Sequence, residues 1–173
     1  TPDERSKLQK ELIVARDRVK FSGLLALGML NAILLVFCNW LSIWDLRSIK
    51  TWDLNSITVQ FLSAINVFLI CVLVGPKAHD EGPIDLEDFY WRQRPYFYGA
   101  LLACAVLSLF ANLDYLKTAN AALFVKENLT VMPMFIPTVL ALVSRKRWVQ
   151  WTGGLGYLAM VLAYTILFCS TLS

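Results

Sequence analysis

Five long stretches without a charged residue constrain what this 173-residue chain can fold into. They cover residues 21–44, 54–76, 95–113, 128–144 and 148–173, and contain 24, 23, 19, 17 and 26 residues. A helix rises about 1.5 Å per residue, so about 20 residues cross a hydrocarbon core about 30 Å thick. None of the stretches shows the period-two alternation of a membrane β-barrel strand. We therefore predict an all-α integral membrane helical bundle with five transmembrane helices, at about 21–44, 55–76, 96–113, 128–144 and 148–169.

Composition agrees with a membrane protein, because 57% of the residues are hydrophobic and only 17% are charged. Residues 21–173 form the predicted transmembrane bundle. Residues 1–20 form a charged amphipathic N-terminal segment with an incomplete apolar stripe. We expect this segment to lie on the membrane surface, held by headgroup attraction, or to dock on a partner.

Lysine and arginine predict the orientation of the bundle. With five spans, the N-terminal segment shares one side with the second and fourth loops, and that side holds 12 of the 16 basic residues. If residues 128–144 did not span, the division would fall to 9 against 7. Since basic residues stay preferentially in cytoplasmic loops, we predict a cytoplasmic N-terminus and an extracytoplasmic C-terminus.

Aromatic side chains gather at the ends of the predicted helices, where amphipathic rings favour the headgroup layer. We predict membrane-anchoring roles for Trp40, Trp44, Trp91, Tyr96, Trp148 and Trp151.

The stretch "DLEDFYWRQRPYFYG", residues 85–99, leads from the second loop into the third span. Asp85 is placed to cap a short interfacial helix that precedes the span. Arg92 and Arg94 are expected to face lipid phosphates or the acids of the same loop, and Arg145 and Arg147 of the fourth loop are expected at the same headgroup level.

An enzymatic alternative uses the same stretch. Asp85, Glu87 and Asp88 would then hold a metal for a lipid-phosphate enzyme that uses the loop 77–95. The sequence contains no second acidic motif of that kind.

Small residues at four-residue spacing predict where helices pack closely. These residues are Gly99 with Ala103 and Ala159 with Ala163, supported by Gly153, Gly154 and Gly156.

Pro133 and Pro137 lie four residues apart in the shortest uncharged stretch and are expected to kink its helix. Proline-interrupted spans line binding sites in some transporters, and Asn66 and Asn112 could extend such a pathway. Packing interactions between helices are the alternative for all four residues.

The sequence offers little for catalysis or for cofactor binding. None of the five stretches contains Asp, Glu, His, Lys or Arg, the usual carriers of chemistry inside a bilayer. The only histidine, His79, lies in a loop, and the four cysteines have no metal-ligand spacing. We predict no catalytic residue and no metal site, we expect no nucleic-acid partner, and the cofactor stays unknown.

A low-specificity resemblance adds to this picture. The segment "WDLRSIKTWD", an apolar span, and then "GPKAHDEGPIDLEDFYWRQRPYFYG" resemble a group of uncharacterised multi-spanning bacterial inner-membrane proteins. The resemblance covers about residues 14–173 in outline. It implies a bacterial inner (cytoplasmic) membrane location and this architecture, and it implies no activity.

Three functional hypotheses follow. The first is a non-catalytic integral membrane subunit that packs against other subunits and lipids, and stabilises or organises a larger complex that could include pigments. The second is a small oligomeric transporter or channel. The third is the lipid-headgroup enzyme.

Overall fold

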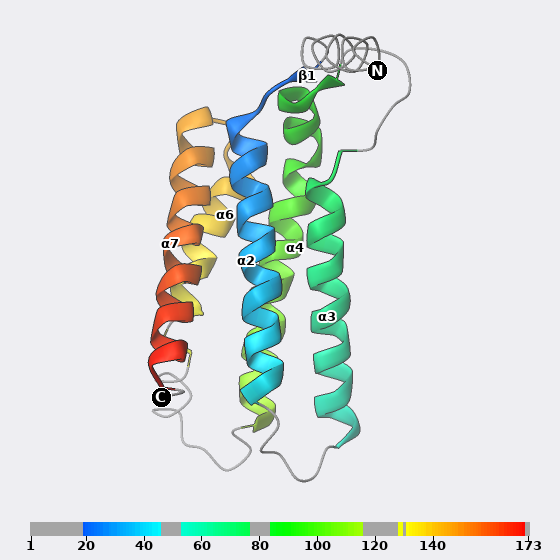
Figure 1. The fold of residues 1–173 in the computed structure, drawn as a ribbon, viewed down its shortest axis with the longest axis vertical. Helices are drawn as coiled ribbons and strands as arrows, with labels where there is room; N and C mark the ends of the chain where they lie inside the picture. The colour runs from blue at the N-terminus through cyan, green and yellow to red at the C-terminus, as the bar shows by residue number, and fades with distance from the viewer. Residues whose placement is uncertain (1–18, 46–52, 77–83, 116–127, 130, 172–173) are drawn as a thin grey trace, which may run out of the picture.

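The computed structural model describes residues 19–45, 53–76, 84–115, 128–129 and 131–171, which form a bundle of helices that run side by side (Figure 1). The predictions for residues 1–18, for the loop residues 46–52, 77–83 and 116–127, and with them for His79, lie outside the described residues. In chain order, the elements are β1 (Val19–Lys20), α2 (Gly23–Asp45), α3 (Leu54–Val74), β2 (Ile84–Asp85), α4 (Leu86–Tyr115), the 3-10 turn η2 (Met132–Met134), α6 (Phe135–Val143) and α7 (Arg147–Thr171).

In the part of the chain that the structure describes, three helices are long and apolar enough to cross a membrane, over Gly23–Trp44, Leu54–Val74 and Leu86–Asn112. The prediction of an all-helical integral membrane protein is confirmed at this level. Two helices begin at a side-chain cap: the Ser22 hydroxyl accepts the Leu25 N–H before α2, and the Asp53 carboxylate accepts the Ser56 N–H before α3.

Helix α4 differs from the prediction, which placed a short interfacial helix before Pro95 and a separate span after it. The structure has one helix of 30 residues that continues through Pro95. Proline removes one backbone donor, whereas a break would leave several backbone groups without partners near the bilayer. The helix therefore tolerates the proline and joins the loop to the span.

The segment predicted as the fourth span also differs. Among the described residues of this segment, Met132–Val143 are helical, and 12 residues reach about 18 Å, well short of a hydrocarbon core. Pro133 lies in the turn η2 and Pro137 is the third residue of α6, where backbone donors have no partner within the helix. The two prolines thus lie at the start of a short helix, and the kink expected from them stays a prediction.

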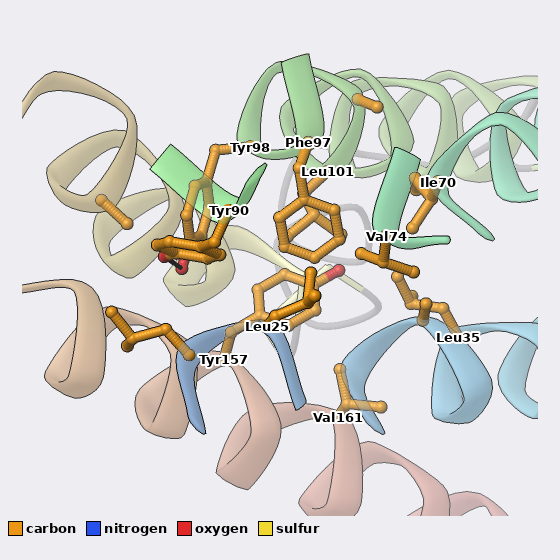
Figure 2. Packing of buried hydrophobic residues seen from close by; sticks show 14 of the residues in the cluster. Leu25, Leu35, Ile70, Val74, Tyr90, Phe97, Tyr98, Leu101, Tyr157 and Val161 are labelled. Carbon is orange, nitrogen blue, oxygen red and sulfur yellow. Dashed lines mark hydrogen bonds between the residues drawn. The ribbon is translucent and has the colours of Figure 1, made fainter. Parts of the chain in front are cut away.

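Side chains from five helices meet in one apolar core. Helix α4 packs mainly on α3 and α6, and α2 packs on α3 and α7. Figure 2 shows how Leu25, Val74, Phe97 and Tyr157, one from each of α2, α3, α4 and α7, face one another. Each of these side chains is almost fully buried.

Two of the predicted small residues allow a very close approach of α7 to its neighbours. A Cβ atom on Gly153 would lie 2.9 Å from the Ala141 Cβ and 3.1 Å from the Pro137 carbonyl oxygen. A Cβ on Gly154 would lie 2.7 Å from a methyl group of Leu27. The packing role predicted for this pair is confirmed, whereas a Cβ on Gly99 would meet nothing within 4 Å.

Substitution of these glycines tests the packing. Gly153→Ala should lower the free energy of unfolding by about 1–3 kcal/mol, because its methyl group forces the α6 backbone to move. Gly99→Ala is the matched control, and should be neutral or stabilising by up to about 1 kcal/mol through helix propensity. Reversible unfolding in mixed micelles measures both, and equal losses in the two variants would contradict the packing described here.

Candidate functional site

Polar side chains gather in the interior of the bundle at the end that carries β1 and β2. Tyr90, Arg94 and Tyr98 lie one turn apart on α4, and Gln150 reaches them from α7. All four are at most 6% exposed. We call these four residues the arginine cluster.

Arg94 binds the carboxyl end of α6. Its Nη1 donates to the carbonyl oxygen of Ala141 at 3.3 Å and to that of Ser144. The last carbonyls of a helix have no partner within it, and the helix dipole makes that end partly negative. The buried guanidinium therefore donates hydrogen bonds to these carbonyl oxygens and balances part of the negative charge at the helix end.

Gln150 makes the same connection from α7. Its Nε2 donates to the carbonyl oxygens of Ala141 at 2.8 Å and Ser144 at 2.5 Å. Its Oε1 accepts the Tyr90 hydroxyl at 2.8 Å, and that hydroxyl lies 3.5 Å from the Tyr98 hydroxyl. The cluster thereby joins α4, α6 and α7.

Aromatic rings cover the cluster on α4. The Arg94 Cζ lies 5.9 Å from the centroid of the Trp91 ring, within cation–π range. Trp91 and Tyr90 also meet edge to face, with centroids 5.6 Å apart. Trp91 packs against the core, so its ring does more than mark the membrane boundary.

Arg94 corrects the sequence-based expectation, which placed it at the surface beside Arg92. It is 6% exposed and bonds backbone carbonyls of α6. A signal was present in the sequence: Tyr90, Arg94, Tyr98 and Leu101 follow helical spacing, so the buried stripe of α4 passes through the arginine. The proline after Arg94 obscured this periodicity.

The acids of residues 85–88 each meet a basic partner. Asp85 accepts the Glu87 and Asp88 N–H groups at 2.9 and 3.0 Å, so the predicted cap is confirmed. Its other carboxylate oxygen lies 2.9 Å from Lys20 Nζ. These contacts bring the start of the described chain to α4.

Two further ion pairs use the remaining acids. Asp88 pairs with Arg92 one turn later at 3.2 Å, and Glu87 pairs with Arg147 at the start of α7 at 3.3 Å. Within the described part of the chain, no group of three His, Cys, Asp or Glu side chains could hold a metal ion. Arg145 is exposed on the connection from α6 to α7.

The anchoring aromatics lie on the outside of the bundle. Trp40 and Trp44 stack on each other near the end of α2, and Trp148 begins α7. Tyr96 is exposed on α4, and Trp151 is partly covered by the start of α2 at Gly23. Their exposure is what the anchoring prediction requires.

The two asparagines proposed for a pathway make bonds between chain segments. Asn66 of α3 donates to the Ala100 carbonyl of α4 at 3.0 Å. Asn112 donates to the Asn128 side chain at 2.5 Å. These contacts favour the packing interpretation.

The remaining small residues divide by exposure. Gly156 faces the Pro137 ring at ordinary contact distance, as expected for a packing residue. Ala103 on α4 and the pair Ala159 and Ala163 on α7 are exposed. Their faces do not pack against described parts of this chain.

Comparison with known proteins found no matching protein family, no matching curated protein and no matching solved structure.

Removal of Arg94 tests the role of the cluster in stability. Arg94→Ala should lower the free energy of unfolding by about 2 kcal/mol or more, because charge-assisted hydrogen bonds are lost at a buried helix end. Arg92→Ala removes the same charge from an exposed pair and should change it by less than about 0.5 kcal/mol. Unfolding in mixed micelles distinguishes the two variants, and a similar small effect in both would contradict the capping role.

The contact between Lys20 and Asp85 predicts the pH range over which this ion pair stabilises the fold. The hydrogen bond from Lys20 and those from the Asp88 and Glu87 N–H groups lower the pKa of Asp85 below its ordinary 3.8. The same hydrogen bond and the Asp85 charge raise the pKa of Lys20 above 10.5. The contribution of Asp85 to the free energy of unfolding is therefore present above pH 3.8 and is lost as the pH falls through its lowered pKa. That of Lys20 is present below pH 10.5 and is lost as the pH rises through its raised pKa.

Titration of the Asp85 carboxyl carbon by NMR measures this effect. The apparent pKa should lie below 3.8 in the wild-type chain and move upward in Lys20→Met. An unchanged value in Lys20→Met would show that the two charges do not interact in solution.

Proposed function

We propose that the chain is a non-catalytic subunit of a larger membrane protein complex, which it stabilises by packing against transmembrane helices of other subunits. One observation carries the proposal: the face of α4 around Gly99 has the small residues of a close helix contact, and no described part of the chain packs closely on Gly99. A Cβ atom added to Gly99 would meet nothing within 4 Å, whereas a Cβ added to Gly153 or Gly154 would lie less than 3 Å from a neighbouring side chain.

The face follows the spacing of a helix-packing seam. Tyr96, Gly99, Ala103, Val106 and Phe110 succeed one another at intervals of three and four residues, and Gly99 alone of the five is only partly exposed. We call these five residues the α4 face. Small residues in its middle let another helix approach, and the larger side chains at its ends provide apolar contact area.

Charge supports the orientation of this subunit. All six Lys and Arg side chains in the described ranges lie at the end of the bundle with β1, β2 and the connection from α6 to α7 (Figure 1). That end is the cytoplasmic one in our proposal. The resemblance in residues 44–53 and 75–99 supports a bacterial inner membrane.

A bulky side chain in the middle of the α4 face tests the subunit role. Ala103→Leu should reduce co-purification of partner subunits by about tenfold, because it blocks close helix approach. Ala64→Leu makes the same substitution on the exposed side of α3 and serves as the matched control. Purification in mild detergent, followed by quantitative mass spectrometry of bound proteins, measures the effect.

Two outcomes would contradict the proposal. The wild-type chain isolated alone, without partners at fixed stoichiometry, would exclude the subunit role. Equal partner recovery with Ala103→Leu and Ala64→Leu would exclude the α4 face as the contact.

A further inference from the structure

The Lys and Arg side chains at the end of the bundle with β1 and β2 differ in whether an acid neutralises them. Three of the six in the described ranges form ion pairs with the acids of residues 85–88, and these three are Lys20, Arg92 and Arg147. Arg94 is buried and bonds the end of α6. Arg145 and Lys146 are exposed and form no ion pair with a described residue. Two adjacent cations of this end are therefore left without a counter-charge in the part of the chain that the structure describes.

The backbone holds these two cations in place on the connection from α6 to α7. The Ser144 carbonyl oxygen accepts hydrogen bonds from Arg94 and Gln150. The Ser144 hydroxyl accepts the Lys146 N–H at 3.2 Å, and the Lys146 carbonyl oxygen accepts the Val149 N–H at 3.0 Å as α7 begins. The arginine cluster thus fixes the turn that carries both cations.

Exposed indole rings adjoin this turn. Trp148 is 64% exposed in the first turn of α7, and Trp151 is 36% exposed one turn later. The start of α7 lies at the same end of the bundle as β1 (Figure 1). Tryptophan rings at the end of a membrane bundle favour the headgroup layer. Because Trp148 follows Lys146 by two residues, that layer reaches the two cations as well.

We propose that Arg145 and Lys146 bind the phosphate group of an anionic phospholipid, while the Trp148 ring lies in the same headgroup layer. We call these three residues the α7 patch. Arginine offers parallel donors to two phosphate oxygens, and lysine adds a compact point charge. The phosphate also offsets the unfavourable placement of cations at the positive end of the α7 dipole. The exposed indole favours a lipid as the source, because a free anion gains nothing from an apolar ring beside it.

This inference does not rest on the proposed subunit role. The α7 patch shares no residue with the α4 face, so Ala103→Leu should leave lipid retention unchanged. Loss of partner subunits and loss of lipid are therefore separate observations.

Native mass spectrometry of the full chain in mild detergent tests the proposal. The wild-type chain should retain phosphatidylglycerol more strongly than phosphatidylcholine with the same acyl chains. Arg145→Gln and Lys146→Gln should each weaken retention of phosphatidylglycerol about fivefold and leave that of phosphatidylcholine unchanged. Both side chains are exposed, so these variants are expected to fold.

Arg92→Gln is the matched control, because it removes one exposed positive charge from the same end of the bundle. Since Asp88 already neutralises Arg92, this variant should retain phosphatidylglycerol as the wild type does. Equal losses in Arg92→Gln and Arg145→Gln would show that only the net charge of this end matters, and would overturn the assignment to the α7 patch.

A gain of binding provides a second test. Glu87 pairs with Arg147, the residue between Lys146 and Trp148. Glu87→Gln releases this arginine beside the α7 patch and should strengthen retention of phosphatidylglycerol about fivefold. A purely structural role of the ion pair predicts no such gain. Unchanged or weaker retention in Glu87→Gln would contradict the proposal.

Two further measurements identify the ligand. Inorganic phosphate should not raise the unfolding temperature of the lipid-free chain, whereas phosphatidylglycerol should, and an equal rise with both would assign the patch to free phosphate. The double variant Arg145→Gln with Lys146→Gln should lose the preference for phosphatidylglycerol. If it instead retained that lipid as the wild type does and lost a co-purified protein, the patch would belong to an acidic partner protein. Either of these contrary results would overturn the lipid assignment.

Discussion

The free carbonyl oxygens at the end of α6 are the constraint on which this half of the bundle depends. A helix that stops after nine residues exposes unpaired backbone acceptors close to a lipid environment, where water cannot satisfy them. Arg94 from α4 and Gln150 from α7 converge on the same two carbonyls. The short helix is thus stable only where it meets both long helices.

Much of the fold follows from hydropathy and charge. The uncharged runs located α2, α3 and α7 to within a few residues, because lipid imposes a strong length requirement on helices. The cap at Asp85 could also be predicted, because a carboxylate that accepts N–H groups of the following turn depends only on neighbouring residues. These correct predictions each had a local or a bilayer-imposed cause.

The arginine cluster depends on contacts that are distant in the sequence. Residue 94 meets carbonyls 47 and 50 residues later, and no local pattern gives that pairing. Pro95 also suggested a boundary in a helix that in fact continues. The small residues illustrate the same limit: spacing predicts that Gly99 and Gly153 favour close packing, but only the three-dimensional arrangement shows which of them already has a neighbour.

The parallel pairing of β1 with β2 has a consequence for biogenesis. Val19 aligns with Ile84 and Lys20 with Asp85, so the two ends of this contact are 65 residues apart. Strand β1 is synthesised before α2 and α3, and its partner is synthesised after both. The contact therefore closes only after the first two helices have been synthesised, and it then links the segment before α2 to the start of α4.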